Sequence, residues 1–326
     1  MALLRTQAVR VHEPGGPEAL SVETIEVGDP GPGQVRMTHE AIGLNFIDTY
    51  HRSGLYEIEL PATIGSEGAG IVEAVGPGVE GLAAGDRVAY GDALGAYAGA
   101  RVIDAGRLVR LPDSIEAEIA AATMLKGLTA WYLLHRTHRV RAGETLLVHA
   151  AAGGVGSLLC QWARALGARV LGTAGSREKA ERARAAGCDA VIRYRDEDVA
   201  SRVSELTAGR GVDVAYDGVG ASTFEASLAS LAPFGLLASF GNASGPVPPV
   251  NLLSLRKKGV YLTRPSLGLH VAAPEDLRRG AHALFTALTD GTLEVLIGQR
   301  FRLEEARAAH ESLETRLTVG STLLLP

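Results

Sequence analysis

The feature that most constrains the fold is a regular alternation of strand-like and helical segments that begins near residue 145. Residues 146–150 form a short apolar run, and the apolar residues after it recur at helical spacing from Val155 to Leu166. Further strand-like runs lie at 169–174, 190–194, 212–217 and 235–241, and the helical segments between them lie at 176–186, 196–207 and 222–231. Five strands separated by helices predict a parallel, doubly wound sheet.

The turn between the first strand and its helix has the composition of a dinucleotide-binding turn. The Rossmann fingerprint Gly-x-Gly-x-x-Gly is met by Gly153 and Gly156 at its second and third positions, while Ala151 takes the first. The second glycine lets the backbone approach a pyrophosphate, and the helix N-terminus offers N–H groups to the phosphates. A tight βα turn without a ligand is the alternative, but the surrounding alternation favours nucleotide binding.

The end of the second strand indicates which cofactor is bound. NAD enzymes usually carry Asp or Glu about 20 residues after the glycine turn, where it holds the ribose 2′-hydroxyl. Here the strand runs into Gly175, Ser176 and Arg177, and Lys179 follows. A hydroxyl and two positive charges suit a 2′-phosphate, which favours NADPH over NADH. The alternative is a solvated helix start with incidental basic residues.

Residues 1–125 show a different sequence pattern, in which short β-like runs are separated by turns rich in Gly and Pro. This pattern predicts a partly open β-barrel. A helix is expected at 274–288, and a last β-like run lies at 321–325. We therefore expect a first domain at 1–125, a dinucleotide-binding domain at 126–265 and a C-terminal segment at 266–326 that returns to the first domain.

Composition excludes several classes of function. The chain has 32 Lys and Arg against 37 Asp and Glu, and its formal net charge of −5 disfavours a general nucleic-acid or membrane surface. No uninterrupted apolar run reaches ~18 residues, so we expect no membrane span. The only cysteines, Cys160 and Cys188, are expected to be small buried residues in a reducing compartment such as the cytoplasm.

Several segments spread over nearly the whole chain are similar to one enzyme family. They include His12-Glu-Pro-Gly-Gly-Pro17, Ile64-Gly-Ser-Glu-Gly-Ala-Gly70 and residues 42–50, 52–56, 125–129, 151–156, 239–242 and 262–267. The chain resembles the medium-chain dehydrogenase/reductase superfamily and, within it, the NADPH:quinone oxidoreductases related to zeta-crystallin. The resemblance implies a GroES-like, partly open β-barrel catalytic domain, a Rossmann domain that binds NADPH, a quinone substrate and a homodimer.

The residues also predict that no metal takes part. The alcohol dehydrogenase branch of the superfamily takes zinc ligands at two positions that are Asn45 and Ser66 here, and neither is a good ligand for Zn²⁺. His135 and His138 are spaced three apart, which could bring them to one helix face, but no third ligand is evident. A solvated helix end is the alternative for these two histidines.

Hydride transfer to a quinone needs orientation and a hydrogen-bond donor near each developing oxyanion. Four side chains are candidate catalytic groups: Asn45, Tyr50, Tyr56 and Lys126. The tyrosines could instead be core aromatics, and Lys126 could be a surface charge at a helix start.

The resemblance also assigns cofactor contacts. Phe46, Asp48 and Thr129 would lie near the nicotinamide, although Asp48 could instead brace its loop. Gly154 and Val155 would contact the pyrophosphate, and Gly175, Ser176, Lys179 and Tyr194 would border the 2′-phosphate. The residues that would close over the cofactor are Phe240, Asn242, Arg264, Ser266 and Arg316.

Two other functions compete with a quinone reductase. An NADPH-dependent enoyl or α,β-unsaturated carbonyl reductase would need a placed acid, for which Tyr50 or Tyr56 could serve. A nucleotide-dependent RNA-binding or crystallin-like protein is the non-enzyme alternative, and the sequence shows no basic patch with interleaved aromatics to support it.

Overall fold

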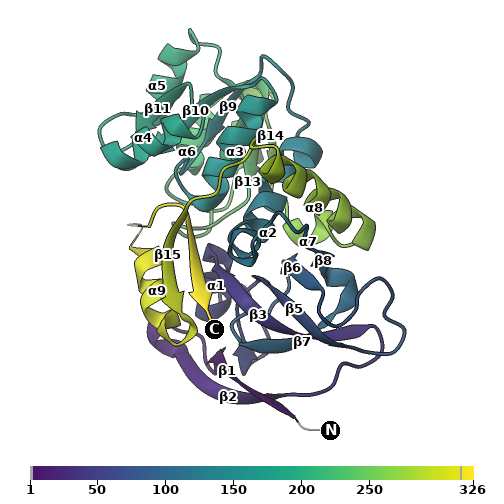
Figure 1. Ribbon diagram of the computed structural model, residues 1–326. Coiled ribbons are helices and arrows are strands. Elements are labelled where there is room, and N and C mark those ends of the chain that lie inside the picture. Colours follow the sequence, from purple (N-terminus) through teal and green to yellow (C-terminus); the bar gives the residue numbers. More distant parts are fainter. Residues whose placement is uncertain (1–2, 316–317) are drawn as a thin grey trace. The chain divides into compact units, whose positions relative to one another are not determined.

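The computed structural model describes residues 3–315 and 318–326. Contacts divide the chain into two compact units (Figure 1). The first unit comprises Met1–Leu128, Val271–Thr289 and Val295–Pro326, and the second comprises Thr129–His270 and Asp290–Glu294. No helix among the described residues is both long enough and apolar enough to cross a membrane.

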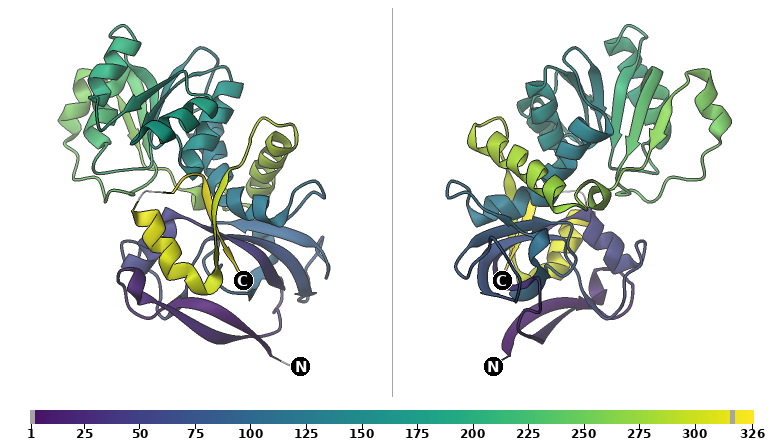
Figure 2. Two further views of the ribbon diagram at one scale, coloured as in Figure 1. Left: turned by 60° about the vertical axis from the view of Figure 1, so that its left-hand side comes forward. Right: turned by 90° about the vertical axis from the view of Figure 1, so that its right-hand side faces the viewer.

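The second unit is built on a six-stranded sheet in which all neighbouring strands are parallel. The strand order is β11 (Ala190–Arg193), β10 (Arg169–Ala174), β9 (Thr145–Val148), β12 (Val212–Asp217), β13 (Leu231–Ser239) and β14 (Tyr261–Thr263). The connecting helices are α3 (Gly154–Ala165), α4 (Arg177–Ala185), α5 (Val199–Leu206) and α6 (Phe224–Ser230), and they cover both faces of the sheet (Figure 2). The predicted doubly wound Rossmann sheet is confirmed.

The strand order reverses between β9 and β12, so the carboxyl ends of these strands form a topological switch point. Ligands of doubly wound sheets bind at such points. The core beneath it is made of strand residues such as Leu147, Leu171 and Ala215, together with Val203 and Phe224 from the helices.

Some predicted boundaries were wrong for local reasons. The first strand ends at Val148 because Ala150 already has a positive φ of 51° and belongs to the turn. The strand expected at 235–241 begins earlier, at Leu231. Leu231 pairs with Val212 before a bulge, and Leu236 pairs with Val214 after it. The sheet also has a sixth strand, β14, at its edge, within the run Val260–Thr263 that the sequence offers as an edge strand.

The first unit holds two sheets. The larger, seven-stranded sheet has the order β15 (Ile297–Arg302), β16 (Ser321–Leu325), β3 (Gln34–Leu44), β5 (Glu67–Val75), β6 (Arg87–Gly91) and β8 (Val109–Arg110), and β7 (Ala100–Asp104) also pairs with β3. The smaller sheet has the order β2 (Leu20–Val27), β1 (Leu4–Val11) and β4 (Ala62–Thr63). A bridge between Ala8 and Ala98 links β1 to the segment before β7.

Helices complete the first unit. They are α1 (Phe46–Ser53), α8 (Pro274–Thr289), α9 (Ala306–Glu314) and the part of α2 (Ala117–Tyr132) up to Leu128. The short helix α7 (Leu267–His270) and a π-helical turn (Leu133–Thr137) belong to the second unit. Short 3-10 helices lie at Pro17–Ala19, Ala105–Arg107, Leu252–Lys257 and Leu303–Glu305. The C-terminal strand β16 pairs antiparallel with β3, so the end of the chain lies in the same sheet as residues 34–44.

Candidate active site

The glycine turn follows β9 at the switch point. The backbone N–H of Gly153 donates to the carbonyl oxygen of Ala150 over 2.8 Å, which closes a tight turn before helix α3 begins at Gly154. Gly153 is the N-cap residue and has no side chain with which to cap the helix. The N–H groups of Gly154, Val155 and Gly156 therefore lie in a first helical turn that favours an anion.

Gly156 allows the close packing that a dinucleotide site requires. A Cβ at this position would overlap the carbonyl oxygen of Ala150 and lie 3.0 Å from the Cα of Ala151. At Gly153 a Cβ would lie 3.1 Å from the same carbonyl oxygen. Glycine is therefore required at position 156, where a Cβ would overlap the backbone, whereas at position 153 the added contact would be tight.

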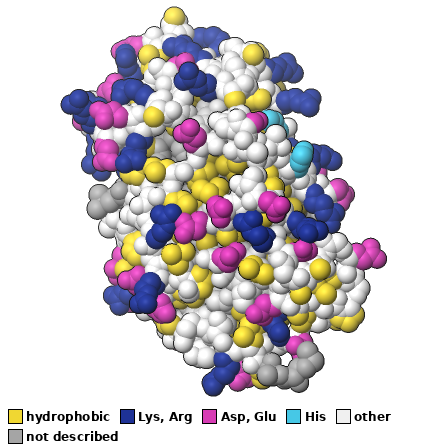
Figure 3. All heavy atoms as spheres, in the orientation of Figure 1, with side chains coloured by type: hydrophobic (Ala, Val, Ile, Leu, Met, Phe, Trp, Pro, Cys, Tyr) yellow, Lys and Arg dark blue, Asp and Glu magenta, His cyan; other side chains and the backbone are white. Residues whose placement is uncertain are grey.

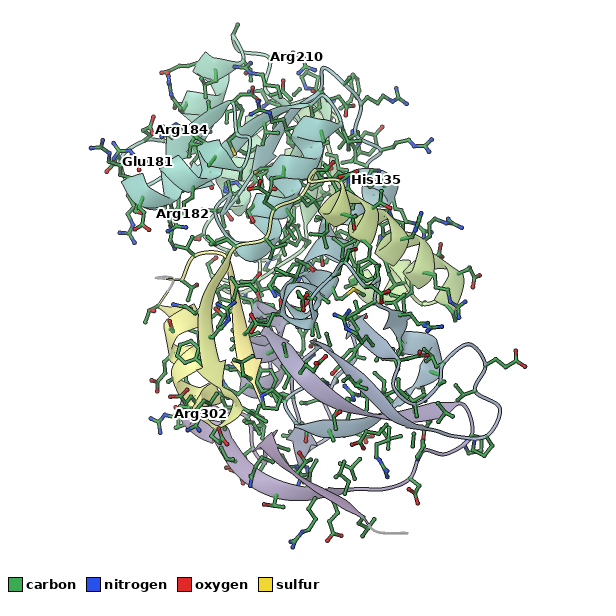
Figure 4. The ribbon with its side chains drawn as sticks, viewed as in Figure 1. His135, Glu181, Arg182, Arg184, Arg210 and Arg302 are labelled. Carbon is green, nitrogen blue, oxygen red and sulfur yellow. The ribbon has the colours of Figure 1, made fainter. Side chains whose placement is uncertain are left out.

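The end of β10 leads into a strongly charged helix. The Ser176 hydroxyl oxygen accepts a hydrogen bond from the backbone N–H of Lys179 over 3.2 Å and caps α4. Arg177 is highly exposed and forms an ion pair with Glu181 at 3.2 Å. Glu181 and Arg182 project from α4 (Figure 4), and Lys and Arg side chains gather over this part of the surface with acidic ones between them (Figure 3). Tyr194 lies against Gly175, where a Cβ would overlap the tyrosine hydroxyl.

Other predicted cofactor contacts lie beyond β12 and β13. The backbone N–H of Phe240 donates to the carbonyl oxygen of Asp217 over 2.8 Å, and Arg264 donates to the carbonyl oxygen of Ser239 over 2.7 Å. Asn242 forms a turn in which its carbonyl oxygen accepts from the N–H of Gly245. Ser266 lines, with Arg264, a cavity of about 800 Å³ beside β14. Thr129 is buried in α2, and Arg316 lies outside the described residues.

A buried carboxylate binds two of the four predicted catalytic groups, Asn45 and Lys126. Glu67, the first residue of β5, is completely buried and forms an ion pair with the ammonium group of Lys126. The same carboxylate accepts hydrogen bonds from the Asn45 side-chain amide over 2.8 Å and from the backbone N–H of Leu125 over 2.7 Å. Lys126 is therefore not a surface charge at a helix start: it is 5% exposed and lies inside α2.

Asp48 forms a second buried acidic centre next to this one. Its carboxylate accepts hydrogen bonds from the backbone N–H of Asn45 over 2.9 Å and from the hydroxyl groups of Ser66 and Tyr97 over 3.0 Å each. Burial raises the pKa of Asp48 to about 7 even though these three donors favour the charged form. Asp48 thus braces the loop and the first turn of α1, which carries Phe46.

A hydrogen-bonded chain continues from Asp48 across the first unit. The Tyr97 hydroxyl lies 3.0 Å from His310 Nε2, and Arg52 lies 2.9 Å from His310 Nδ1. Because Arg52 can only donate, His310 Nδ1 accepts and Nε2 carries the proton. Burial lowers the pKa of His310 to about 3, so the imidazole is neutral at neutral pH.

The two tyrosines that sequence reasoning selected lie together. Tyr50 and Tyr56 have ring centroids 5.3 Å apart in an edge-to-face arrangement, and the backbone N–H of Tyr56 donates to the carbonyl oxygen of Tyr50 over 3.1 Å. Tyr50 is 8% exposed, and Tyr56 is partly exposed. Both rings come from the end of α1 and the loop after it.

The two histidines considered for a metal have separate partners. His135, labelled in Figure 4, packs edge-on against Trp162 with ring centroids 5.4 Å apart. His138 Nε2 lies 3.0 Å from the carboxylate of Glu144. Within residues 3–315 and 318–326, no three His, Cys, Asp or Glu side chains gather as a metal site requires. Cys160 and Cys188 are both buried, as predicted, with their sulfur atoms 3.4 Å apart.

Comparison with known proteins places this arrangement in a family. The alcohol dehydrogenase GroES-like domain matches residues 31–113, and the zinc-binding dehydrogenase domain matches residues 154–286. A quinone oxidoreductase of Pseudomonas aeruginosa is 54% identical over 96% of this chain and 97% of its own length. The chain belongs to the medium-chain dehydrogenase/reductase family.

Other members of this family are similar over their full lengths. A 2-haloacrylate reductase of a Burkholderia species is 44% identical over 98% of both chains. The crystal structure of an Escherichia coli quinone oxidoreductase complexed with NADPH superposes with a TM-score of 0.96 and 46% identity, and covers 98% of this chain and 100% of that one. The GroES-like and Rossmann folds implied by the resemblance are confirmed.

The description of the second family model mentions zinc, but the donor set of this chain does not fit that metal. Asn45 and Ser66 stand where the alcohol dehydrogenase branch is expected to carry zinc ligands; here the Asn45 amide donates to Glu67 and the Ser66 hydroxyl donates to Asp48. The Asn45 amide nitrogen has no lone pair to offer a metal. Lys126 also places a positive charge against the Glu67 carboxylate, which disfavours a cation there.

Sequence reasoning missed Glu67, Tyr97 and His310. Glu67 follows Gly65 and Ser66 in a segment used for the resemblance, and a carboxylate at the start of an apolar strand was a usable signal. No local signal marked Tyr97 or His310, because their partners are far away in the sequence.

Proposed function

We propose that this chain is an NADPH:quinone oxidoreductase that transfers hydride to a quinone without a metal. The observation that carries the proposal is the full-length similarity to an Escherichia coli quinone oxidoreductase complexed with NADPH, at 46% identity. When bound, NADPH supplies the hydride. The protein supplies binding, orientation and electrostatic stabilisation.

The second unit would bind the cofactor. The first turn of α3, with Gly153, Gly154, Val155 and Gly156 after Ala151, suits the pyrophosphate. Ser176, Arg177, Lys179 and Tyr194, around Gly175, suit the 2′-phosphate because they combine hydroxyl groups with positive charge. Further contacts are proposed from Thr129, Phe240, Asn242, Arg264, Ser266 and Arg316. The nicotinamide contacts expected from Phe46 and Asp48 stay predictions, and the buried carboxylate of Asp48 is already held by Asn45, Ser66 and Tyr97.

The first unit would stabilise charge on the quinone oxygens. Lys126 is the strongest candidate because Glu67 takes one of the three N–H donors of its ammonium group and fixes its direction. Tyr50 and Tyr56 offer hydroxyl groups. The Asn45 amide nitrogen is directed at Glu67, so we propose that Asn45 acts mainly by holding this carboxylate in place.

A substrate panel tests the function. With NADPH as donor, we expect 1,2-naphthoquinone to be reduced with a kcat/KM at least about tenfold above that of a 2-enoyl substrate. A chelator should leave the rate unchanged. A clear preference for the enoyl substrate, or loss of activity that zinc restores, would contradict the proposal.

The second candidate function is reduction of an α,β-unsaturated substrate. The 44% identity with a protein named 2-haloacrylate reductase favours it. After hydride addition, this reaction must protonate a carbon atom, and the Tyr50 or Tyr56 hydroxyl would be the acid. The same substrate panel distinguishes the two functions.

We also propose that the protein is cytoplasmic, because a chain with only two cysteines suits a reducing compartment.

We further propose that two copies of the chain pair through the β14 edge of the sheet. Tyr261, Phe234 and Leu269 leave 61%, 75% and 82% of their surfaces exposed around this edge. Light scattering should give twice the mass of 34.0 kDa. Tyr261→Glu should lower it toward one copy, whereas Val22→Glu on β2 should not; a monomeric wild type would refute the pairing.

A further inference from the structure

A continuous chain of side-chain hydrogen bonds lies beneath the glycine turn. His149, directly after β9, is flanked by Thr173 of β10 on one side and Ser227 of α6 on the other. Ser227 reaches Asp217 at the end of β12. These four side chains are at most 3% exposed, and they come from three strand ends and one helix of the second unit.

The direction of every hydrogen bond in this chain is determined. Asp217 can only accept, so the Ser227 hydroxyl donates to it over 2.7 Å, and the Ser227 oxygen accepts from His149 Nε2 over 2.9 Å. His149 Nδ1 is then an acceptor for the Thr173 hydroxyl at 3.2 Å. Burial lowers the pKa of His149, which keeps the imidazole in this neutral form.

The side chains at the two ends of this hydrogen-bonded series, Thr173 and Asp217, accept hydrogen bonds from backbone N–H groups. The Thr173 oxygen accepts from the N–H of Ala150 over 3.2 Å, and the Thr173 carbonyl accepts from the N–H of Ala151 over 3.0 Å. Ala150 has a φ of 51°, a left-handed conformation that a non-glycine residue keeps only when its surroundings impose it. At the other end, the second carboxylate oxygen of Asp217 accepts from the N–H groups of Val219 and Gly220 over 2.8 and 3.0 Å.

The order of these groups rules out a Ser–His–Asp nucleophile at this place. A Ser–His–Asp nucleophile needs the histidine between serine and carboxylate, so that it can take the serine proton. Here the serine lies between histidine and carboxylate and gives its proton to Asp217. The arrangement therefore serves to hold the backbone.

We propose that His149, through Thr173, is a positioning residue that sets the backbone of the Ala150 turn and thereby aims the first N–H groups of α3 at the cofactor pyrophosphate. The proposal rests on the proposed NADPH binding. It assigns no contact between His149 and the cofactor. We therefore expect weaker binding of ligands that carry the pyrophosphate and unchanged binding of ligands that lack it.

Thr173→Val tests this, because it removes the hydroxyl and keeps the shape, and Thr173→Ser is the matched control that keeps the hydroxyl. We expect Thr173→Val to raise the Kd of NADPH, measured by fluorescence, about tenfold, the effect of one lost hydrogen bond to a positioned group. Thr173→Ser should stay within about threefold of wild type. The Kd of adenosine 2′-phosphate, which has no pyrophosphate, should not change in either variant.

Ser227→Ala provides a second, independent break in the chain and decides the matter if Thr173→Val does not fold. It should weaken NADPH and spare adenosine 2′-phosphate in the same way. Equal losses for both ligands, or none, would overturn the positioning role. If wild type itself fails to bind NADPH, the proposed function is wrong instead.

Discussion

Lys126→Met is expected to lower the free energy of unfolding by about 3–5 kcal/mol, since it leaves a buried carboxylate without its cation. Glu67 is completely buried and, among the described residues, would keep the amide of Asn45 and the N–H of Leu125 as its donors. The same substitution should lower kcat/KM for a quinone by about 10²–10³-fold, the usual effect of removing one donor from a developing oxyanion. Chemical denaturation and steady-state kinetics measure the two effects separately.

A double variant separates the two roles of Lys126. Lys126→Met combined with Glu67→Gln leaves no buried charge at this place, so the double variant should regain most of the stability lost in Lys126→Met. Its quinone activity should stay low, because the ammonium group is still missing. If stability and activity return together, Lys126 only neutralises Glu67 and is not a catalytic residue.

The fold of the second unit could be predicted because its signals are local. The strand and helix periodicities lie within segments of a few residues, and the glycine turn needs only the six residues from Ala151 to Gly156. Even the errors were local, such as the left-handed Ala150 that ends β9 early.

The groups around the predicted catalytic residues could not be found in this way. Glu67 and Lys126 are 59 residues apart, and Arg52 and His310 are 258 apart. Nothing in the sequence next to Lys126 marks it as buried, and a lysine normally faces water. Only the packing of α2 against β5 makes it a buried ion-pair partner, so its environment depends on the tertiary structure.

Replacing both Arg177 and Lys179 by Ala is expected to raise the Kd of NADPH about tenfold to a hundredfold and to change that of NADH by less than about threefold. Only NADPH carries the 2′-phosphate that these charges would bind. The expected increase in the Kd of NADPH is smaller than the loss of two full charge-assisted hydrogen bonds would give. The reason is that Arg177 is highly exposed and also pairs with Glu181.

Arg182→Ala is the matched control for this double variant. Arg182 forms an ion pair with Glu178 at 3.2 Å, one helical turn apart on α4, just as Arg177 does with Glu181. The control therefore loses a similar surface pair, worth a few tenths of a kcal/mol, without touching the proposed pocket. Titrating both nucleotides at low and high salt completes the test, because screening should reduce the preference of wild type for NADPH. Equal losses of NADPH and NADH in the double variant would mean that the 2′-phosphate is bound elsewhere, and the specificity would then have to come from Tyr194 or from residues beyond α4.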